Sequence, residues 1–159
     1  MPLKNYTTEI SAMKSIGEIQ GKLVAHGASA VMINYGPDRE PRNLSFIVPT
    51  HNGDLPFRLP ANVKKVEAIL LSMRATKPES WHRDYKKTME RIQKQAARVA
   101  WRILKDWVDA QLAIIETEMV TLEQVFLPYL QIKGEQTLYE AMVDRGFYLK
   151  EGKESDTTF

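Results

Sequence analysis

The sequence contains no cysteine among its 159 residues. This absence excludes disulfide bonds, thiolate zinc sites and cysteine nucleophiles. No apolar run approaches the roughly 20 residues that a transmembrane helix requires, and the N-terminal residues MPLKNYTTEI lack the apolar segment of a secretory signal. We therefore expect an intracellular, cytoplasmic protein that does not enter a membrane.

Catalytic signatures are also missing. His82, Arg83 and Asp84 match three letters of a kinase catalytic loop, but no Gly-rich loop or Asp-Phe-Gly motif accompanies them. His26 and His51 stand near turns without the second pair of ligands that a metal site needs. The sequence therefore predicts no enzyme activity, no metal site and no cofactor.

The small net charge of +2 conceals a gradient along the chain. Residues 1–60 carry six Lys or Arg and five Asp or Glu, residues 61–110 carry twelve and six, and residues 111–159 carry four and nine. The segment balances are therefore +1, +6 and −5. Because a basic zone concentrates polyanions and an acidic zone repels them, an anionic partner is expected to bind the middle of the chain.

Three short runs are typical of antiparallel strands. Residues 28–35 are short and rich in apolar and β-branched side chains, and in residues 43–50 Leu44, Phe46 and Val48 alternate with polar or outward positions. The two runs are separated by a Gly-Pro-Asp turn signal, which predicts a hairpin. Residues 55–60 predict a third strand, and its two prolines place it at an edge of the sheet. Residues 4–10 are a candidate for a fourth short strand.

Helical periodicity flanks these strands on both sides. Residues 13–24 predict one helix, and Pro60 opens a second one after the strands. Beyond a polar linker, the longest periodic segment predicts a third helix from Ser80 to about Val120. The apolar stripe of this helix is too wide to stay exposed, so it must cover the sheet or the equivalent stripe of a second subunit.

The predicted fold class is therefore α+β, with a three-stranded antiparallel sheet packed by helices and one long helix in the second half of the chain. Residues 1–76 form a compact α-β-β-β-α unit, and residues 77–149 form a helical extension packed on it within one domain. Thr121 and Thr137 are placed to cap two short helices of the extension. Residues 150–159 are polar and are expected to be a mobile tail.

The order of elements in the first half of the chain resembles that of the double-stranded RNA-binding domain. Gly36 and Pro37 stand between the first two strands, and Lys64 with Lys65 opens the closing helix. In that family paired lysines hold phosphates across the groove, so the resemblance implies nucleic-acid contacts by both lysines. The histidine that the family places after Gly-Pro is absent, because Asp38 follows here.

The long predicted helix carries a stripe of basic side chains. At 100° per residue, the stripe spans about 80° of the helix surface. We call it the basic ridge; its members are Lys87, Arg91, Lys94, Arg98, Arg102 and Lys105. Solvated helix faces usually mix charges, since like charges at these spacings destabilise a helix. The ridge is therefore an uncompensated solvated face, or it is neutralised by the acidic C-terminal segment, by an external polyanion or by a partner protein.

Aromatic residues near the ridge suggest contacts with single-stranded nucleic acid. Trp81 and Tyr85 lie in the basic sequence SWHRDYKK, where bases can stack on the rings while cations hold phosphates. Trp101 and Trp107 have a simpler explanation, because a helix that packs onto a sheet places such residues in the core.

The sequences RVAWRILKDWVDAQLAIIETEMVTLEQVFLPYL, GEQTLYEAM and GDLPFRLPANV resemble small uncharacterised proteins of bacteriophages and related mobile elements. The resemblance spans most of the chain and implies no catalytic residue; it implies action on nucleic acid or on a host protein in the host cytoplasm. We therefore expect a non-catalytic, sequence-tolerant DNA-binding protein, with DNA favoured over RNA and single strands as a weaker expectation. The alternative is an interaction protein that inhibits or redirects a host or defence protein.

Overall fold

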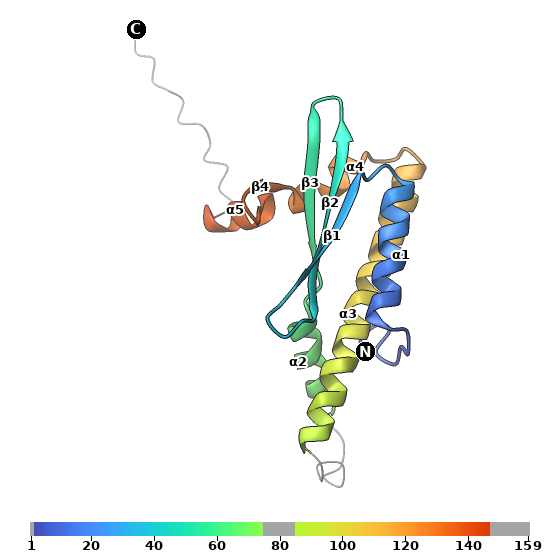
Figure 1. Ribbon diagram of the computed structural model, residues 1–159, viewed down its shortest axis with the longest axis vertical. Helices are drawn as coiled ribbons and strands as arrows, with labels where there is room; N and C mark the ends of the chain where they lie inside the picture. The colour runs from blue at the N-terminus through green and yellow to red at the C-terminus, as the bar shows by residue number, and fades with distance from the viewer. Residues whose placement is uncertain (1, 75–84, 147–159) are drawn as a thin grey trace.

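The computed structural model describes residues 2–74 and 85–146 (Figure 1). Its elements, in chain order, are α1 (Ala12–Ala25), β1 (Ala30–Tyr35), β2 (Pro41–Thr50), β3 (Gly53–Pro60), α2 (Val63–Arg74), α3 (Tyr85–Glu116), α4 (Leu122–Phe126), the 3-10 turn η2 (Leu127–Tyr129), β4 (Gln131–Lys133), β5 (Gln136–Thr137) and α5 (Leu138–Asp144). The three-stranded sheet and the long helix α3 confirm the predicted α+β fold.

The sheet is an antiparallel meander in the order β1-β2-β3. Val31 pairs with Phe46, and Phe46 pairs with Phe57, so the three side chains lie on one face. On the same face, Leu44 and Leu59 also pair and are fully buried. The strand β3 lies at an edge of the sheet, as its two prolines predicted.

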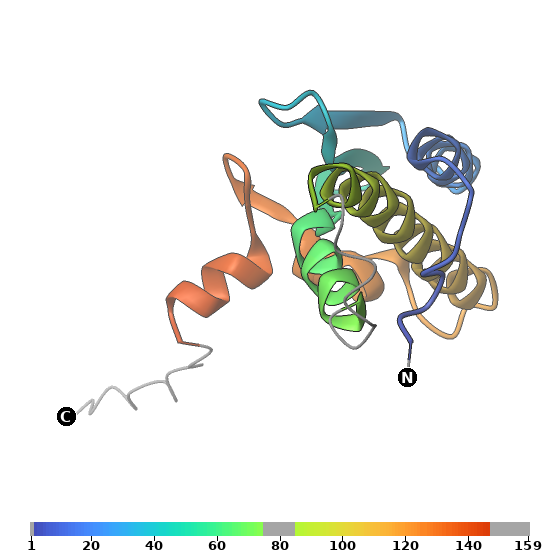
Figure 2. The ribbon, with the colours of Figure 1, turned by 90° about the horizontal axis from the view of Figure 1, so that it is seen from below.

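Helices α1 and α3 cover this apolar face. Ile16 and Leu23 of α1 and Trp101 and Val108 of α3 belong to the same core cluster as the sheet residues. Phe126 of α4 closes the cluster, with its ring centroid 5.3 Å from that of Phe46. Seen from below, α3 lies under the sheet and α1 lies beside α3 (Figure 2). The first and second halves of the chain therefore share one apolar core.

The helix α2 packs on α3, and none of its residues is buried. Residues of α3, and none of α2, belong to the core cluster of the sheet. The physical reason is the size of the apolar side chains on α3, because Trp101, Val108 and Leu112 are all buried in the core.

Residues 4–10 form turns and extended chain, so the prediction of a strand there is wrong. Gln95 of α3 donates hydrogen bonds from Nε2 to the carbonyls of Tyr6 (3.0 Å) and Thr8 (2.9 Å), and Asn5 donates to Asp106 (2.9 Å). Side chains of α3 thus satisfy polar groups that a neighbouring strand would otherwise pair. The additional strands are β4 and β5, which pair with each other.

The helix α3 begins at Tyr85 and ends at Glu116, inside the predicted span, and it continues without a break through Arg98. Its end is followed by Glu118 in the left-handed region (φ 60°), which cannot continue a right-handed helix. The predicted caps are confirmed, since Thr121 and Thr137 accept hydrogen bonds from the first turns of α4 and α5. The tail at residues 150–159 lies outside the described residues.

His26 joins the C-terminal ends of α1 and α3. Its Nδ1 lies 2.7 Å from the carbonyl oxygen of Lys22, and its Nε2 lies 2.6 Å from Oε1 of Glu116. Both neighbours are acceptors, so the ring satisfies both only when both nitrogens carry a proton. The Lys22 carbonyl and the Glu116 carboxylate therefore raise the pKa of His26 above its ordinary value of 6.5, against the opposing effects of burial and of the Lys22 charge.

This arrangement predicts a pH dependence of stability. The pKa of His26 is higher in the folded state than its ordinary value of 6.5, so protonated His26 stabilises the fold. This contribution is fully present below pH 6.5 and is lost as the pH rises through the folded-state pKa, which lies above 6.5. Urea denaturation at a series of pH values should show that the free energy of unfolding of the wild type falls as the pH rises through this range. The same plot for His26→Gln should be flatter. His51→Gln, which removes an exposed imidazole, should keep the wild-type profile. If His26→Gln shows the same dependence of stability on pH as the wild type, His26 is not the group responsible for it.

Candidate nucleic-acid interface

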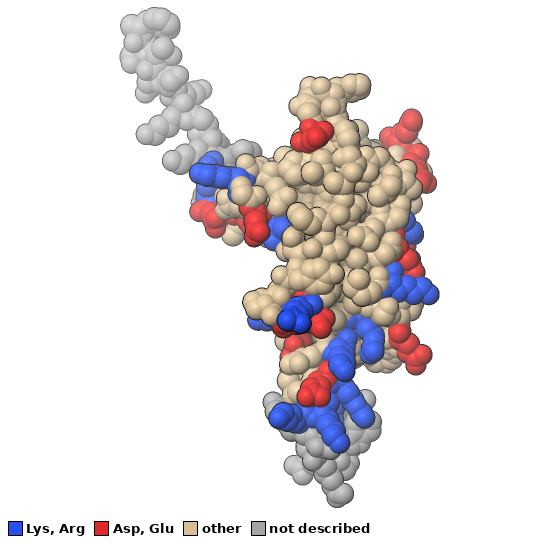
Figure 3. All heavy atoms as spheres, in the orientation of Figure 1, with Lys and Arg blue, Asp and Glu red and all other residues tan. Residues whose placement is uncertain are grey.

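The structure divides the basic ridge into an exposed half and a paired half. In the N-terminal half of α3, Lys87, Arg91 and Lys94 are exposed. With the residues that the structure describes, Arg91 and Lys94 make no ion pair and no side-chain hydrogen bond. Figure 3 shows Lys and Arg gathered over the lower end of the molecule, where the N-terminal half of α3 lies. At Arg91 and Lys94, this half of the ridge is therefore open to a partner.

The C-terminal half of the ridge is neutralised within the fold. Arg102 pairs with Glu18 of α1 at 2.9 Å, and Lys105 pairs with Asp109 at 2.6 Å and with Glu18 at 3.7 Å. The side chains of Arg102 and Lys105 are only 17% and 15% exposed. The prediction that they contact phosphate is therefore corrected: both lie in the packing between α1 and α3. Among the described residues, the acids that pair with Arg102 and Lys105 come from these two helices.

These ion pairs keep their members charged. Desolvation opposes ionisation of Glu18, but the hydrogen bond from Arg102 and the charges of Arg102 and Lys105 outweigh it and lower the pKa of Glu18. Desolvation likewise opposes ionisation of Asp109, and hydrogen bonds from Lys105 and Lys22 lower its pKa. The hydrogen bond to Asp109 is also the main reason that the pKa of Lys105 is raised.

Arg98 stands at the boundary between the two halves. It is partly buried, and its Nη1 donates to Oε1 of Gln95 at 3.2 Å. Gln95 in turn donates hydrogen bonds to backbone carbonyls of the N-terminal segment, so Arg98 is tied to that segment through Gln95. Among the described residues Arg98 has no ion pair, and its charge adds to the open half of the ridge.

A cleft of about 680 Å³ lies between α2, α3 and the β1–β2 turn. Its charged lining residues are Arg42, Lys64, Lys94 and Arg98 with Asp38, Glu40, Glu67 and Glu90. The four basic and four acidic groups balance, and Arg42 pairs with Asp38 at 3.0 Å. The cleft itself is therefore not a basic groove, and its four acids partly offset the charges of Lys64, Lys94 and Arg98, whereas Arg91 does not line it.

Lys64 and Lys65 are adjacent in sequence but face different hollows. Lys64 lines the cleft that Lys94 and Arg98 also line, whereas Lys65 lines a separate apolar pocket. The structure therefore brings Lys64 to the open half of the ridge and places Lys65 elsewhere. A paired phosphate contact, as implied by the resemblance to the double-stranded RNA-binding domain, is not the arrangement found here.

The four aromatic residues near the ridge have different placements. Trp81 lies outside the described residues, and Tyr85 begins α3 with its side chain also outside them. Base stacking on these two rings stays a prediction. Trp101 is fully buried in the core. Trp107 is partly buried and packs edge-to-face against Phe126, with ring centroids 5.8 Å apart.

Sequence reasoning missed Glu18, which decides how much of the ridge is open. Glu18 lies on α1 at 31% side-chain exposure and contacts both Arg102 and Lys105. The only signal for it in the sequence was its position in a predicted helix, since nothing local showed which helix would lie beside α3. The pocket lined by Lys65 and Trp107 was missed for the same reason, because its walls come from elements far apart in sequence.

No family model, curated protein or solved structure matches this chain. Within residues 2–74 and 85–146, no three His, Asp or Glu side chains are grouped so as to hold a metal ion. The helices of that part of the chain include none that is long and apolar enough to span a bilayer. The resemblance to bacteriophage proteins accordingly stays a prediction.

The ion pairs between α1 and α3 predict that Asp109→Asn destabilises the protein. The change removes the charge that Lys105 and Lys22 contact, at a cost of about 1 kcal/mol, kept small because the lysines are partly exposed. For a domain of this size, that is a fall in melting temperature of about 2–4 °C. Asp54→Asn, at an exposed position of β3, is the matched control.

The effect of Asp109→Asn should also depend on pH. The pKa of Asp109 is lowered from 3.8, so its contribution is present above pH 3.8 and is lost as the pH falls through the folded-state pKa below that value. Melting curves should therefore show the difference between variant and wild type shrinking in acid. Equal melting temperatures of the two proteins at neutral pH would show that these pairs do not stabilise the fold.

Proposed function

We propose that this protein binds nucleic acid without catalysing a reaction, through the N-terminal half of α3 and Lys64 of α2. The observation that supports the proposal is the open half of the ridge, where Arg91 and Lys94 are exposed on a helix and lack an acidic partner among the described residues. Such a surface attracts phosphates and releases counterions when it binds them. Phosphate contacts do not read bases, so binding is sequence-tolerant.

The size of the surface sets the strength of binding. From Lys87 to Arg98 the helix advances by about 17 Å, at 1.5 Å per residue. This length matches about five phosphates of one duplex strand, which are about 3.4 Å apart along the axis. With Lys87, Arg91, Lys94, Arg98 and Lys64 as the contacts, the logarithm of the association constant should fall with the logarithm of salt concentration at a slope of about −4.5 for duplex or about −3.5 for single strands.

The preference for DNA rests on the resemblance to bacteriophage proteins. The weaker expectation of single strands rests on Trp81 and Tyr85, whose rings would stack on bases next to the open half of the ridge. Titrations with single-stranded and duplex DNA and RNA of equal length, at one low salt concentration, rank these ligands directly.

The test of this proposal is the double variant Arg91→Gln/Lys94→Gln. We expect it to weaken DNA binding by at least tenfold at low salt and to reduce the salt slope by about 1.8 for duplex or about 1.4 for single strands. Both residues are exposed and unpaired within the described part of the chain, so the free energy of unfolding should change by less than about 0.5 kcal/mol. Fluorescence anisotropy of labelled DNA measures both quantities.

The matched control is Lys133→Gln/Arg145→Gln, which removes the same charge from exposed positions at the C-terminal end of the described residues. It should retain wild-type affinity and slope. Equal losses in both double variants would mean that net charge, and not the α3 surface, drives binding. A wild-type protein that fails to bind any of these nucleic acids at low salt would overturn the proposal.

A second candidate function is interaction with a host or defence protein. It is favoured by the region around β4 and α5, which projects from the side of the sheet in Figures 1 and 2. Ile132, Met142 and Val143 of this region are 47%, 37% and 44% exposed. Apolar side chains exposed on a projection are typical of protein contacts. Capture of a partner from nuclease-treated host lysate, lost on Ile132→Lys, would favour this function over nucleic-acid binding.

A further inference from the structure

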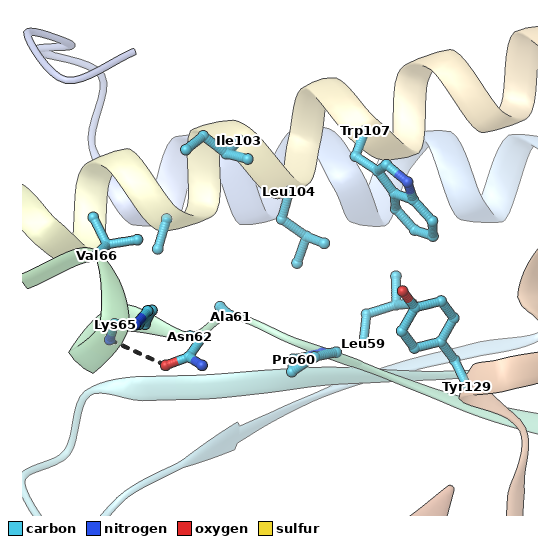
Figure 4. Close-up of a pocket in the computed structure, with 11 residues that line it drawn as sticks. Leu59, Pro60, Ala61, Asn62, Lys65, Val66, Ile103, Leu104, Trp107 and Tyr129 are labelled. Atoms are coloured by element: carbon cyan, nitrogen blue, oxygen red, sulfur yellow. Dashed lines mark hydrogen bonds between the residues drawn. The ribbon is translucent and has the colours of Figure 1, made fainter. Parts of the chain in front are cut away.

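An apolar pocket of about 320 Å³ lies between the end of β3, α2, α3 and η2. Val66 of α2, Ile103 and Leu104 of α3 and Trp107 form its walls, and each is only partly buried (Figure 4). The pocket takes no part in the proposed nucleic-acid interface, because α3 presents other side chains to it. Exposed apolar walls of this kind gain free energy when a ligand removes them from water.

One end of the pocket is polar and positively charged. Asn62 and Lys65 lie together at this end, beside Val66 (Figure 4). The Oδ1 of Asn62 accepts the backbone N–H of Lys65 at 3.1 Å, which leaves the amide nitrogen of Asn62 to donate outward. Lys65 is the only charged residue that lines the pocket, within the described chain, and no acid opposes it there. The polar groups at this end are therefore donors that an anionic ligand would satisfy.

The opposite end is closed by two aromatic rings. Trp107 and Tyr129 meet edge-to-face with centroids 5.5 Å apart (Figure 4). The lining of the pocket along α3 runs from Ala100 to Trp107, which is about 10 Å at 1.5 Å per residue. The volume of about 320 Å³ corresponds to about ten water molecules at about 30 Å³ each. The ligand must therefore be short and narrow.

We propose that this pocket binds a free aliphatic carboxylate of about eight carbons. The carboxylate would lie at Lys65 and the amide of Asn62, and the chain would lie along Ile103 and Leu104 toward Trp107. The charge of Lys65 favours an anion, and a cation would find no acid among the lining residues of the pocket. The apolar walls favour a ligand whose remaining part is hydrocarbon, because a polar group would lose its hydration there.

Octanoate is the probe for this site, with 1-octanol as the neutral analogue and octylammonium as the cationic one. In full-length protein labelled with ¹⁵N, the indole resonance of Trp107, assigned with Trp107→Phe, reports binding at the closed end. We expect saturable octanoate binding with half-saturation at about 0.1–1 mM, ordinary for a ligand of about ten non-hydrogen atoms. Octanol should bind about tenfold more weakly, and octylammonium more weakly still.

Two substitutions separate the head group from the hydrocarbon chain. Lys65→Gln should weaken octanoate binding about tenfold and leave octanol binding unchanged, because Lys65 is exposed and contacts only the charge. Val66→Phe should fill part of the pocket and weaken both ligands. Lys64→Gln is the matched control and should leave octanoate binding unchanged, since Lys64 faces the other cleft. Circular dichroism checks that each variant is folded.

The proposal would be overturned by an absence of saturable octanoate binding, by an unshifted Trp107 resonance, or by equal octanoate affinity in Lys65→Gln and wild type. If a second copy of the chain covers the pocket, the protein should instead self-associate as its concentration rises, and octanoate should not reverse this association. This outcome also contradicts a carboxylate site. None of these measurements depends on nucleic-acid binding, so this proposal and the proposed function can fail separately.

Discussion

The packing of α3 on the inner face of the sheet is the contact on which the other features depend. A helix of 32 residues with a wide apolar stripe gains most of its stability from such packing rather than from its intrinsic helix propensity. Trp101, fully buried against the sheet, fixes the rotation of α3 about its axis. That rotation leaves Arg91 and Lys94 exposed and turns Leu104 and Trp107 toward the apolar pocket.

The two helices beside α3 give one basic stripe two different environments. Toward its C-terminal half, α1 runs alongside and brings Glu18 to Arg102 and Lys105, which partly desolvates these charges and pairs them. No acid of α1 pairs with Arg91 or Lys94 of the N-terminal half, within the described residues. A paired and partly buried cation has little charge left to offer a phosphate, whereas an exposed and unpaired one attracts it through water. On another side of α3, α2 and the end of β3 enclose the apolar pocket together with η2.

Several elements were predictable because their signals are local. Alternation at Leu44, Phe46 and Val48 identified β2, and Thr121 identified the start of α4, since side-chain period and capping act over a few residues. The segment at residues 4–10 was wrongly predicted as a strand. Its carbonyls are instead bonded by Gln95, which is about ninety residues away in sequence, and no local pattern reports such a partner.

The sequence by itself determined the α+β class, the order of strands, the basic stripe of α3 and the apolar stripe opposite it, because each follows from the spacing of residue types along one element. Only the tertiary structure decided which cations remain open, that Lys64 and Lys65 face different hollows, and that a pocket forms beside Trp107. The physical reason is that Coulomb interactions and cavities depend on distances between elements, and these distances are set by packing rather than by separation along the chain.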